Sequence, residues 1–527
     1  MHDVTPSGAR VGLTPEYAVQ YPNVEDGLAA NRSDPSRYVA DVVVVGSGAG
    51  GAPAAARLRD AGFDVLILEE GALHTTASFS TDTVTSLHRL YRDAGTSAIL
   101  GNPPIMFAEG RCVGGSTVVN GGMSWRTPER VLEHWSKDLR LPGLGPAAMD
   151  PYFDQAERIL HVETNHADTF GNNDRLFVAG ARKLGWEVEH NRRNMHRCVG
   201  LNNCAYGCIP GAKQSMLVTE IPRALSAGAR LITHARVRRI LFKNGRAVGV
   251  SGYFVDEYGS KFGRFEVHAR LVVLACGARH TPGLLKRSFV RVKGIGRHLQ
   301  THPNAKVVGV FDERIDPWRG VHQAHQIHQF LEQGILIAYA AVPPGILATG
   351  MPGFGREHGE RMRLYNHMLT AACLIEDRGE GRVVLGPDLE PWMLFKLSPR
   401  DVETIHHGVA LVAELMFAAG ARKVLLPFGT LPEIDSPDEL GKIEQRKHVK
   451  RDIELMTVHI MSTCKMAATA AAGPCDDSAM LRGVPGIAIA DASAIPSSIG
   501  VNPMETIVAL ALRNADLWSE ALKRERV

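Results

Sequence analysis

Two short apolar runs near the start of the chain enclose a helical stretch. Residues 42–45 are four consecutive valines, a run typical of a parallel strand that is buried on both faces. Residues 52–60 form a helical stretch that ends at Gly62, and residues 65–68 (VLIL) form a second apolar run. The order strand, helix, strand predicts a βαβ unit in a parallel sheet.

Glycines and an acid occupy the positions in this unit that a dinucleotide requires. Gly46, Gly48 and Gly51 have G-x-G-x-x-G spacing, which permits a tight turn and lets backbone approach a pyrophosphate at the N-terminus of the helix. Glu69, at the end of the second apolar run, is placed to bind a ribose hydroxyl. The combination predicts dinucleotide binding, which three glycines alone would not.

The later pattern indicates a second layer of sheet and helix. Residues 235–250 (ARVRRILFKNGRAVGV) alternate and turn at Asn244-Gly245, which predicts a β-hairpin. Residues 335–342 read as a strand, and apolar positions from 402 to 416 recur at helical spacing before Gly420 ends the helix. Asn502, Pro503 and Glu505 read as the cap and first turn of a last helix.

Residues 110–128 (GRCVGGSTVVNGGMSWRTP) are too rich in glycine to form a packed regular element. Backbone of this kind can press against a flat group such as a flavin ring, although a surface loop has the same composition. Both interpretations remain open from this segment alone.

Length and charge limit the classes of function. A chain of 527 residues exceeds the size of a single core, so two connected domains are expected. The net charge is +3 and the charges are dispersed, which disfavours nucleic acid and membrane surfaces as partners. We find no signal peptide and no uninterrupted apolar run long enough to span a bilayer, so a cytoplasmic protein is expected.

Four ordered motifs resemble the glucose-methanol-choline (GMC) oxidoreductase family, a group of FAD enzymes that oxidise alcohols. They are GRCVGGSTVVNGG, LVVLACGARHTPGLLKRS, GIGRHLQTHPN, and the C-terminal pair VHIMSTCKM and IAIADASAIPSSIGVNPMETIVALALRNAD. In the second motif Phe289-Val290 replaces the family's Gly and apolar residue, which predicts a rebuilt loop. Within the family, the chain resembles the cholesterol-oxidase-like and long-chain-alcohol-oxidase-like branch.

The resemblance implies an α/β fold in which a Rossmann-like FAD-binding domain carries an inserted sheet-and-helix substrate domain. We assign residues 39–130, 215–305 and 451–527 to the FAD domain, residues 131–214 and 306–450 to the substrate domain, and residues 1–38 to an irregular N-terminal arm. The resemblance also assigns cofactor contacts beyond the glycines and Glu69. These are Gly114, Gly115, Ser116, Asn120, Val237 (through its backbone, to the adenine), Asp491 and Asn502.

Two residues near the C-terminus are the expected catalytic pair. Where many family members have a second histidine this chain has Asn502, and His459 is its partner by the same resemblance. A histidine titrates near neutral pH, so His459 is expected to accept or share the alcohol proton while hydride leaves for flavin N5. The Asn502 amide is expected to hold the substrate oxygen.

Other function classes remain alternatives to alcohol oxidation. A lyase of the hydroxynitrile type keeps the flavin fold without redox turnover, and a flavin-binding protein without catalysis needs neither His459 nor Asn502. Apolar stretches such as residues 392–395 (WMLF), and the absence of an arginine cluster in the inserted region, favour a hydrophobic or bulky alcohol. The sequence does not distinguish oxygen from a redox partner as electron acceptor.

Three of the eight cysteines lie within eleven residues, at Cys198, Cys204 and Cys208. Their spacing resembles that of bacterial FAD-dependent glucose dehydrogenases, relatives that carry an iron–sulfur cluster, and cysteine loops of long-chain alcohol oxidases, which imply none. A zinc site with His196 as fourth ligand and a reduced structural loop are the other interpretations. The spaced histidines His322, His325 and His328 are expected to be structural.

Overall fold

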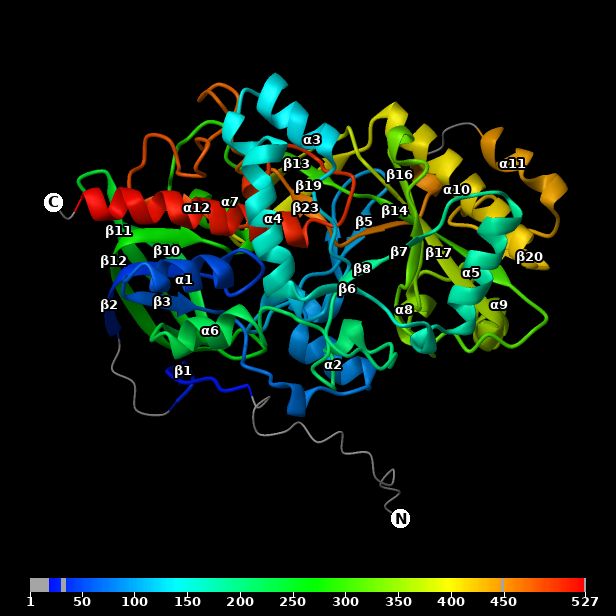
Figure 1. Cartoon of the computed structure of the whole chain (residues 1–527), viewed down its shortest axis with the longest axis horizontal. Helices are drawn as coiled ribbons and strands as arrows, with labels where there is room; N and C mark the ends of the chain where they lie inside the picture. Colours follow the sequence, from blue (N-terminus) through cyan, green and yellow to red (C-terminus); the bar gives the residue numbers. More distant parts are fainter. Residues whose placement is uncertain (1–18, 30–34, 447–449, 526–527) are drawn as a thin grey trace, which may run out of the picture.

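The computed structural model describes residues 19–29, 35–446 and 450–525. They form an α/β protein with two large sheets, one at the left of Figure 1 and one at the right. The smaller helices are α2 (Thr83–Leu90), α3 (Glu129–Glu133), α8 (Pro344–Thr349), α9 (Arg356–Met362) and α11 (Gly441–Glu444). The strands β6 (Val162–Thr164) and β8 (Arg192–Asn194) pair with each other, and β20 (Lys423–Leu425) and β21 (Glu433–Ile434) belong to the larger of the two sheets.

The first sheet has 8 strands and contains the predicted βαβ unit. Its strands are β1 (Val24–Asp26), β9 (Arg230–Thr233), β3 (Val65–Leu68), β2 (Ser36–Val45), β12 (Lys261–Leu274), β11 (Arg246–Val255) and β10 (Ala235–Lys243) in that order, with β24 (Ile487–Ile489) also paired to β12. Strands β9, β3, β2, β12 and β24 run parallel, whereas β10, β11 and β12 form an antiparallel meander. The Rossmann-like prediction is confirmed.

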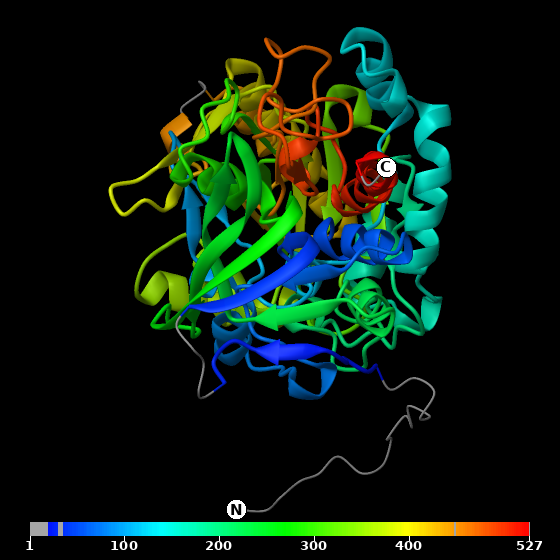
Figure 2. The same cartoon turned by 90° about the vertical axis from the view of Figure 1, so that its left-hand side faces the viewer.

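Helices cover the parallel strands of this sheet (Figure 2). Helix α1 (Gly51–Asp60) packs against β2 and β3 and contacts α6 (Glu220–Ser226) and α12 (Met504–Arg524), and α12 in turn contacts α4 (Pro146–Leu160). The side chains of β2 at residues 42–44 have no exposed surface, as a strand covered on both faces requires.

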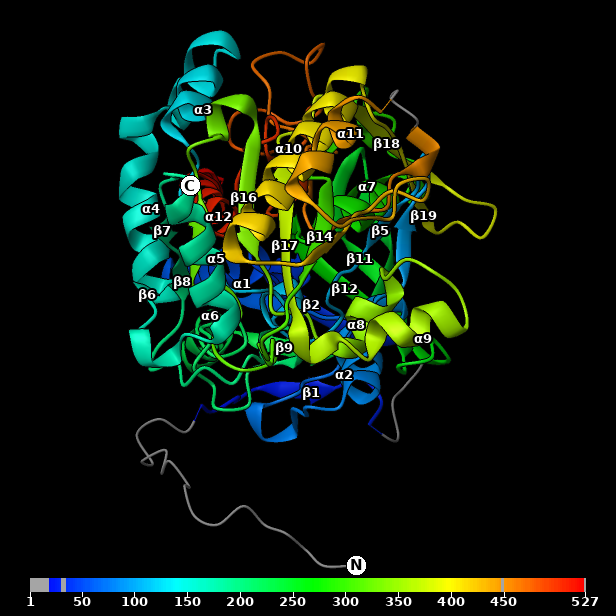
Figure 3. The same cartoon turned by 90° about the vertical axis from the view of Figure 1, so that its right-hand side faces the viewer.

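The second sheet has 10 strands and is covered by helices α10 (Pro399–Ala419) and α5 (Asn172–Lys183) (Figure 3). Its main path is β4 (Ser97–Ile99), β5 (Ile105–Phe107), β22 (Leu455–Thr457), β14 (Asn304–Val310), β17 (Met368–Ile375), β16 (Ile335–Tyr339), β15 (His325–Ile327) and β7 (Glu189–His190). Within the described residues, α10 alone is long and apolar enough to cross a membrane, yet it packs on β14 and β17 as a core helix does.

A third sheet of 4 strands joins the other two layers. Its strands are β19 (Pro391–Lys396), β18 (Glu380–Leu385), β13 (Arg297–Thr301) and β23 (Ile460–Met461), and α7 (Gly277–Arg287) packs against it. The chain passes from this sheet to the ten-stranded one at two neighbouring points. One lies between β13 and β14, at His302-Pro303, and the other between β22 and β23, at Val458-His459.

Several local expectations need correction. The arm 1–38 is not irregular throughout, because β1 pairs with β9 and β2 begins at Ser36, while residues 1–18 and 30–34 lie outside the described residues. Phe289, which stands where the family has glycine, has a left-handed φ of 60°. The expected rebuilding of this loop stays a prediction. In the apolar stretch 392–395, Met393 and Phe395 are buried in the core, so their apolar character reflects packing.

The last helix does not begin as the capping pattern predicts. Pro503 is the N-cap of α12, no side chain caps the helix, and both carboxylate oxygens of Glu505 are buried with no hydrogen-bond partner among the described residues. The predicted hairpin, in contrast, is confirmed, with Asn244 at φ 51° and Gly245 at φ 78° between β10 and β11.

Candidate active site

Several of the predicted cofactor residues follow the carboxyl ends of the parallel strands. Gly46 follows β2, Glu69 follows β3, and Asp491 lies just beyond β24. Backbone hydrogen bonds join these ends: Gly46 N donates to Leu68 O at 2.8 Å, and Ala490 N donates to Leu274 O at 2.8 Å. In open parallel sheets this edge is where ligands bind.

The three glycines of the fingerprint have different surroundings. A Cβ at Gly46 would lie 2.3 Å from Ala275 O, and one at Gly51 would lie 2.0 Å from Gly46 O. Close packing of the backbone therefore requires glycine at both positions. A Cβ at Gly48 would contact only the Cα of Gly115, at 4.0 Å. The protein itself therefore leaves room at Gly48, on the side where the glycine-rich segment approaches.

Glu69 ties the glycine turn to the end of β3. Its Oε2 accepts hydrogen bonds from Ser47 N at 3.1 Å and Ser47 Oγ at 2.6 Å, and its Oε1 accepts from Gly71 N at 2.9 Å. Burial raises the pKa of this carboxyl, while these donors act to lower it. The Glu69 carboxylate thus organises the loop, and its predicted ribose contact remains a prediction.

The glycine-rich segment lies directly against this loop. Gly114 N donates to Ser47 Oγ at 3.0 Å, and the φ angles of Gly114 and Gly115 are 91° and 55°. Ser116 Oγ accepts from Gly110 N, whereas the Oδ1 of Asn120 is buried with no hydrogen-bond partner among the described residues. The segment therefore places backbone and one unpaired amide oxygen beside the fingerprint.

Two further predicted residues flank the same edge. Val237 lies in β10 at a register shift, where a bulge interrupts the pairing with β11. Asp491 is buried, and its Oδ2 accepts from Gly277 N at 2.9 Å and from Thr281 Oγ1 at 2.5 Å, which joins the start of α7 to the end of β24. Burial raises the pKa of Asp491.

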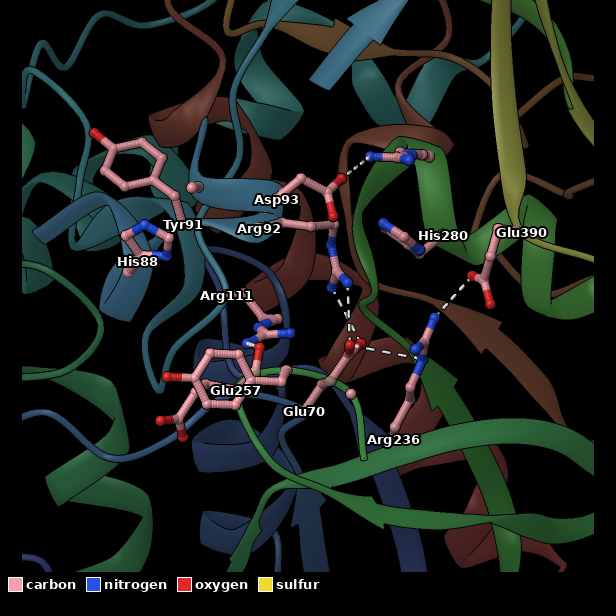
Figure 4. Close-up of a pocket in the computed structure, with 14 residues that line it drawn as sticks. Glu70, His88, Tyr91, Arg92, Asp93, Arg111, Arg236, Glu257, His280 and Glu390 are labelled. Atoms are coloured by element: carbon pink, nitrogen blue, oxygen red, sulfur yellow. Dashed lines mark hydrogen bonds and ion pairs between the residues drawn. The ribbon is translucent and has the colours of Figure 1, made fainter. Parts of the chain in front are cut away.

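A polar cavity of about 370 Å³ lies next to Glu70, the residue after Glu69 (Figure 4). Figure 4 shows the Glu70 carboxylate between Arg92 and Arg236, and Arg236 also pairs with Glu390. The arginines hold the pKa of the partly buried Glu70 carboxyl below its usual range. Two residues that line the cavity, Glu70 and Arg236, are the sequence neighbours of Glu69 and Val237. The motif assigns Glu69 to a ribose hydroxyl, and the resemblance assigns Val237 to the adenine.

His459 and Asn502 lie together although 43 residues separate them. The Asn502 amide is 3.3 Å from His459 Nε2, and the other ring nitrogen, Nδ1, is 3.1 Å from His302 Nδ1. Asn502 Oδ1 is buried with no hydrogen-bond partner among the described residues. Asn502 also stands two residues before α12, so the positive end of that helix faces the pair.

Desolvation changes the acid–base character of this pair. His459 is partly exposed, yet the protein around it lowers its pKa to about 4. His302 is 1% exposed, and burial lowers its pKa well below the usual value. Both rings are neutral near pH 7. Sequence reasoning missed His302, although its His-Pro dipeptide stood inside a motif already identified.

The cysteine loop contacts the glycine-rich segment through two buried cations. Lys213 Nζ donates to the carbonyls of Val118, Asn120 and Cys204 at 2.7–2.8 Å. Arg193 Nη2 donates to Gly121 O at 2.7 Å and to Cys204 Sγ at 3.3 Å. Burial lowers the pKa of Lys213 to about 8.

No metal site is formed by the described residues, where no three His, Cys, Asp or Glu side chains are placed to hold an ion. The three cysteines do not converge as a cluster would require. The spaced histidines have separate partners: His322 bonds Asn202, His325 bonds Asp174, and His328 pairs with Glu189.

The residues present fit an FAD. Gly48 leaves room for a pyrophosphate, and the unpaired Oδ1 of Asn120 is a buried acceptor that a bound group can satisfy. These positions come from segments far apart in the chain and meet at the carboxyl edge of the parallel sheet.

Comparison with known proteins gives consistent matches. GMC oxidoreductase profiles match residues 87–304 and 378–511, and an FAD binding domain profile matches residues 41–92. An uncharacterized GMC-type oxidoreductase of Mycobacterium tuberculosis is 37% identical over 95% of this chain and 79% of its own. A long-chain-alcohol oxidase of Arabidopsis thaliana is 29% identical over 92% of this chain and 68% of its own.

Solved structures share the fold at low identity. Pyridoxine 4-oxidase from Mesorbium loti superposes with a TM-score of 0.69 at 18% identity, covering 91% of this chain and 99% of that one. A formate oxidase superposes with a TM-score of 0.67 at 14% identity, covering 94% and 99%. The likeness extends over more than nine-tenths of this chain.

Proposed function

This chain belongs to the GMC oxidoreductase family, and from that premise we propose that it oxidises the CH–OH group of a hydrophobic alcohol. The observation that carries the proposal is the meeting of His459 Nε2 with the Asn502 amide at the start of α12. Bound FAD supplies the hydride acceptor. The protein supplies two hydrogen-bonding groups that hold one oxygen atom.

The protein groups act on the developing charge. Asn502 has no basic group, so its amide positions the alcohol oxygen, and His459 Nε2 meets the same oxygen. The positive end of α12 lowers the energy of negative charge near its first turn. Together these groups favour the alkoxide character that eases hydride departure.

The hydrophobic substrate is supported by relatives. Several of the curated relatives that share most of this chain's length are long-chain-alcohol oxidases of Arabidopsis thaliana. A paromamine 6'-oxidase of Streptomyces fradiae, at 26% identity, is named for a polar substrate. A test must therefore include both chemical classes.

An anaerobic alcohol panel tests the function. We expect the yellow holoenzyme to bleach with 1-dodecanol, benzyl alcohol or a sterol, and to respond less to a polar sugar alcohol. A lyase would leave the flavin oxidised with every alcohol and would still cleave a hydroxynitrile. Repeating the reduced sample with air and with an artificial acceptor distinguishes an oxidase from a dehydrogenase.

A dehydrogenase that passes electrons through an iron–sulfur cluster is the second candidate. Arg193 and Lys213 are buried beside Cys204, and neither forms an ion pair with a carboxylate within the described ranges. Buried cations without carboxylates favour anionic groups nearby, such as thiolates. The thiols do not converge on a metal position, so we derive no step through a cluster.

Chemical analysis decides this second candidate. If a cluster is present, anaerobically purified protein contains iron and acid-labile sulfide, and Cys204→Ser loses both while retaining FAD. Stoichiometric FAD with neither element leaves a reduced structural loop. Cys373→Ser, at a buried cysteine in β17 of the ten-stranded sheet, is the matched control.

A further inference from the structure

Two histidines face each other where the chain twice crosses between sheets. Thr301 pairs with Ile460 in the four-stranded sheet, and Asn304 pairs with Met456 in the ten-stranded one. The residues between these pairs include His302 and His459. The register on both sides therefore brings the two rings together, with their planes at 87° and their Nδ1 atoms 3.1 Å apart.

The backbone beneath these rings is held by one hydroxyl. Thr457 Oγ1 lies 3.1 Å from the carbonyl oxygens of both His302 and His459, and His459 N donates to the same Oγ1 at 3.1 Å. Thr457 is 2% exposed. The relative position of the two rings is thus set by buried contacts.

A second set of contacts fixes a donor against His302. Gly500 N donates to His302 Nε2 at 3.1 Å. The loop that carries Gly500 is also bonded to β13, the strand that precedes His302. Ser498 N donates to Gln300 Oε1 at 2.7 Å. The carboxylate of Asp377 accepts from both Thr301 N and Ser498 Oγ at 3.0 Å. Gly500 has φ 72°, and a Cβ there would lie 2.8 Å from Glu376 Oε2. The hydrogen bonds of Ser498 thus hold this loop, and with it the Gly500 N–H, beside His302.

These contacts determine where each proton lies. His302 Nε2 accepts a backbone hydrogen bond, so a neutral His302 carries its proton on Nδ1. That N–H points at His459 Nδ1, which must then be an acceptor, and the proton of a neutral His459 lies on Nε2. In the protein without substrate, the Asn502 amide can be turned so that its buried Oδ1 accepts this Nε2–H. A bound substrate oxygen would take the place of Oδ1 as acceptor.

We propose that His302 is a positioning residue that holds His459 in the tautomer with its proton on Nε2, so that His459 donates a hydrogen bond to the substrate oxygen. The inference deepens the alcohol oxidation proposed above and rests on it for the identity of that oxygen. It replaces the proton acceptance expected of His459 with a hydrogen bond. The hydroxyl proton of the alcohol then passes to solvent water, while the carbinol hydrogen leaves as hydride to FAD. To accept a proton at Nε2, a neutral His459 would have to carry its proton on Nδ1, and His302 Nδ1 would then have to accept from it. His302 would in turn carry its own proton on Nε2, where it would meet the N–H of Gly500.

The tautomers are measured directly in the FAD-loaded protein labelled with ¹⁵N-histidine. Long-range ¹H–¹⁵N spectra near pH 7 distinguish a ring protonated at Nδ1 from one protonated at Nε2, and His302→Asn and His459→Gln identify the two signals. We expect Nδ1–H in His302 and Nε2–H in His459. A proton on Nδ1 of His459, or a doubly protonated ring at either position, overturns the proposal.

Substitutions at His459 test what the tautomer does. Gln places an amide N–H close to the position of Nε2 but cannot take up a proton, whereas Ala removes the donor. With 1-dodecanol and benzyl alcohol as probes, we expect anaerobic flavin reduction to fall about a hundredfold or more in His459→Ala, and by no more than about tenfold in His459→Gln. Equal losses in the two variants would show that a proton acceptor is needed, and would contradict the proposal.

Substitutions at His302 test the positioning role. Asn retains a donor at the place of Nδ1, and Leu has nearly the same shape without it. We expect His302→Leu to lower kcat at least about tenfold and His302→Asn to lower it less, with FAD content and melting temperature alike. In a His459→Gln background, His302→Leu should have little further effect, because no imidazole tautomer remains to be set.

Full additivity in that double variant would mean that His302 only packs, and would overturn the positioning role. If no alcohol of the panel bleaches the flavin, the proposed function fails, while the ¹⁵N spectra still decide the tautomer. The two failures are therefore distinguishable.

Discussion

At the scale of single residues, the three fingerprint glycines illustrate two physical causes behind one motif. Gly46 and Gly51 are required by the protein's own backbone, which a Cβ would meet at 2.3 Å and 2.0 Å. Gly48 has no such neighbour, and the nearest atom to an added Cβ is the Cα of Gly115 at 4.0 Å. We therefore propose that the glycine at position 48 is needed for a ligand.

Gly48→Val is expected to fold but to lose the yellow colour, because the isopropyl group fills space that the pyrophosphate needs. The measurement is the ratio of flavin to protein absorbance after purification, with the melting temperature as a check of folding. Gly46→Val is the contrasting variant, since its clash is with Ala275 and it should lose stability as well. A folded Gly48→Val with full FAD would contradict the assignment.

At the scale of elements, α12 and α10 begin in different ways. Helix α10 has a complete capping box, in which Ser398 Oγ accepts from Asp401 N and the Asp401 carboxylate accepts from Ser398 N. Helix α12 has no side-chain cap, because Asn502 turns to His459 instead. The residue that the local pattern favours as a cap lies beside the candidate catalytic histidine.

Ser398→Ala is expected to lower the free energy of unfolding by about 1 kcal/mol, the usual cost of losing an N-cap. Chemical or thermal unfolding measures the loss, and flavin content should not change, since α10 packs on the ten-stranded sheet. Ser398→Thr, which keeps the hydroxyl, is the control. A loss of equal size in Ser398→Thr would mean that packing at this position outweighs the cap.

The first turn of α12 also contains a buried acid that is expected to make stability depend on pH. Glu505 has no exposed surface, and burial together with the neighbouring Glu157 carboxylate raises its pKa to about 8. The folded protein holds this proton, whereas an unfolded glutamate loses it above about pH 4. The contribution is therefore fully present below about pH 4 and is lost as the pH rises to about 8.

Glu505→Gln imitates the protonated side chain and should remove this dependence. We expect the melting temperature of the parent protein to fall more steeply than that of the variant as the pH is raised from about 5 to about 8. Parallel curves would show that Glu505 ionises at no cost in the folded protein. Glu163→Gln, at an exposed acid outside α12, is the control.

At the scale of the whole molecule, the candidate site is assembled from distant parts of the chain. The turn after β2, the glycine-rich segment, the bulge in β10 and the turn after β24 all lie at one edge of the parallel sheet. A ligand that contacts these segments together joins parts of the protein that lie far apart in the sequence. Binding of FAD should therefore stabilise the fold as a unit.

FAD is expected to raise the melting temperature of protein from which the cofactor has been removed, and the rise should grow with FAD concentration. At a hundred times Kd, linkage predicts about 2.7 kcal/mol of added stability. Differential scanning fluorimetry over a range of FAD concentrations measures the shift, and Gly48→Val should show none. A melting temperature that ignores FAD would contradict a cofactor contacting all four segments.

Much of the fold follows from local patterns, because strand, turn and helix signals act within a few residues. The βαβ unit, the Asn244-Gly245 hairpin and the end of α10 at Gly420 are examples of such signals. The family assignment likewise follows from ordered motifs and is confirmed by the profile matches. The division into domains, the roles of the site residues and the cytoplasmic location stay predictions.

The sequence by itself determined the βαβ unit and the dinucleotide fingerprint, because each depends on a motif that is contiguous in the chain. The pairing of His459 with Asn502 was implied by the resemblance to the family, since the two residues lie in separate motifs. Only the tertiary structure decided that His302 faces His459 and that Gly500 N donates to His302 Nε2. It also decided that Asn502 lies against His459 and does not cap α12. The physical reason is that these contacts depend on the register of strands paired across more than 150 residues, and the direction of a hydrogen bond is set only when both partners are in place.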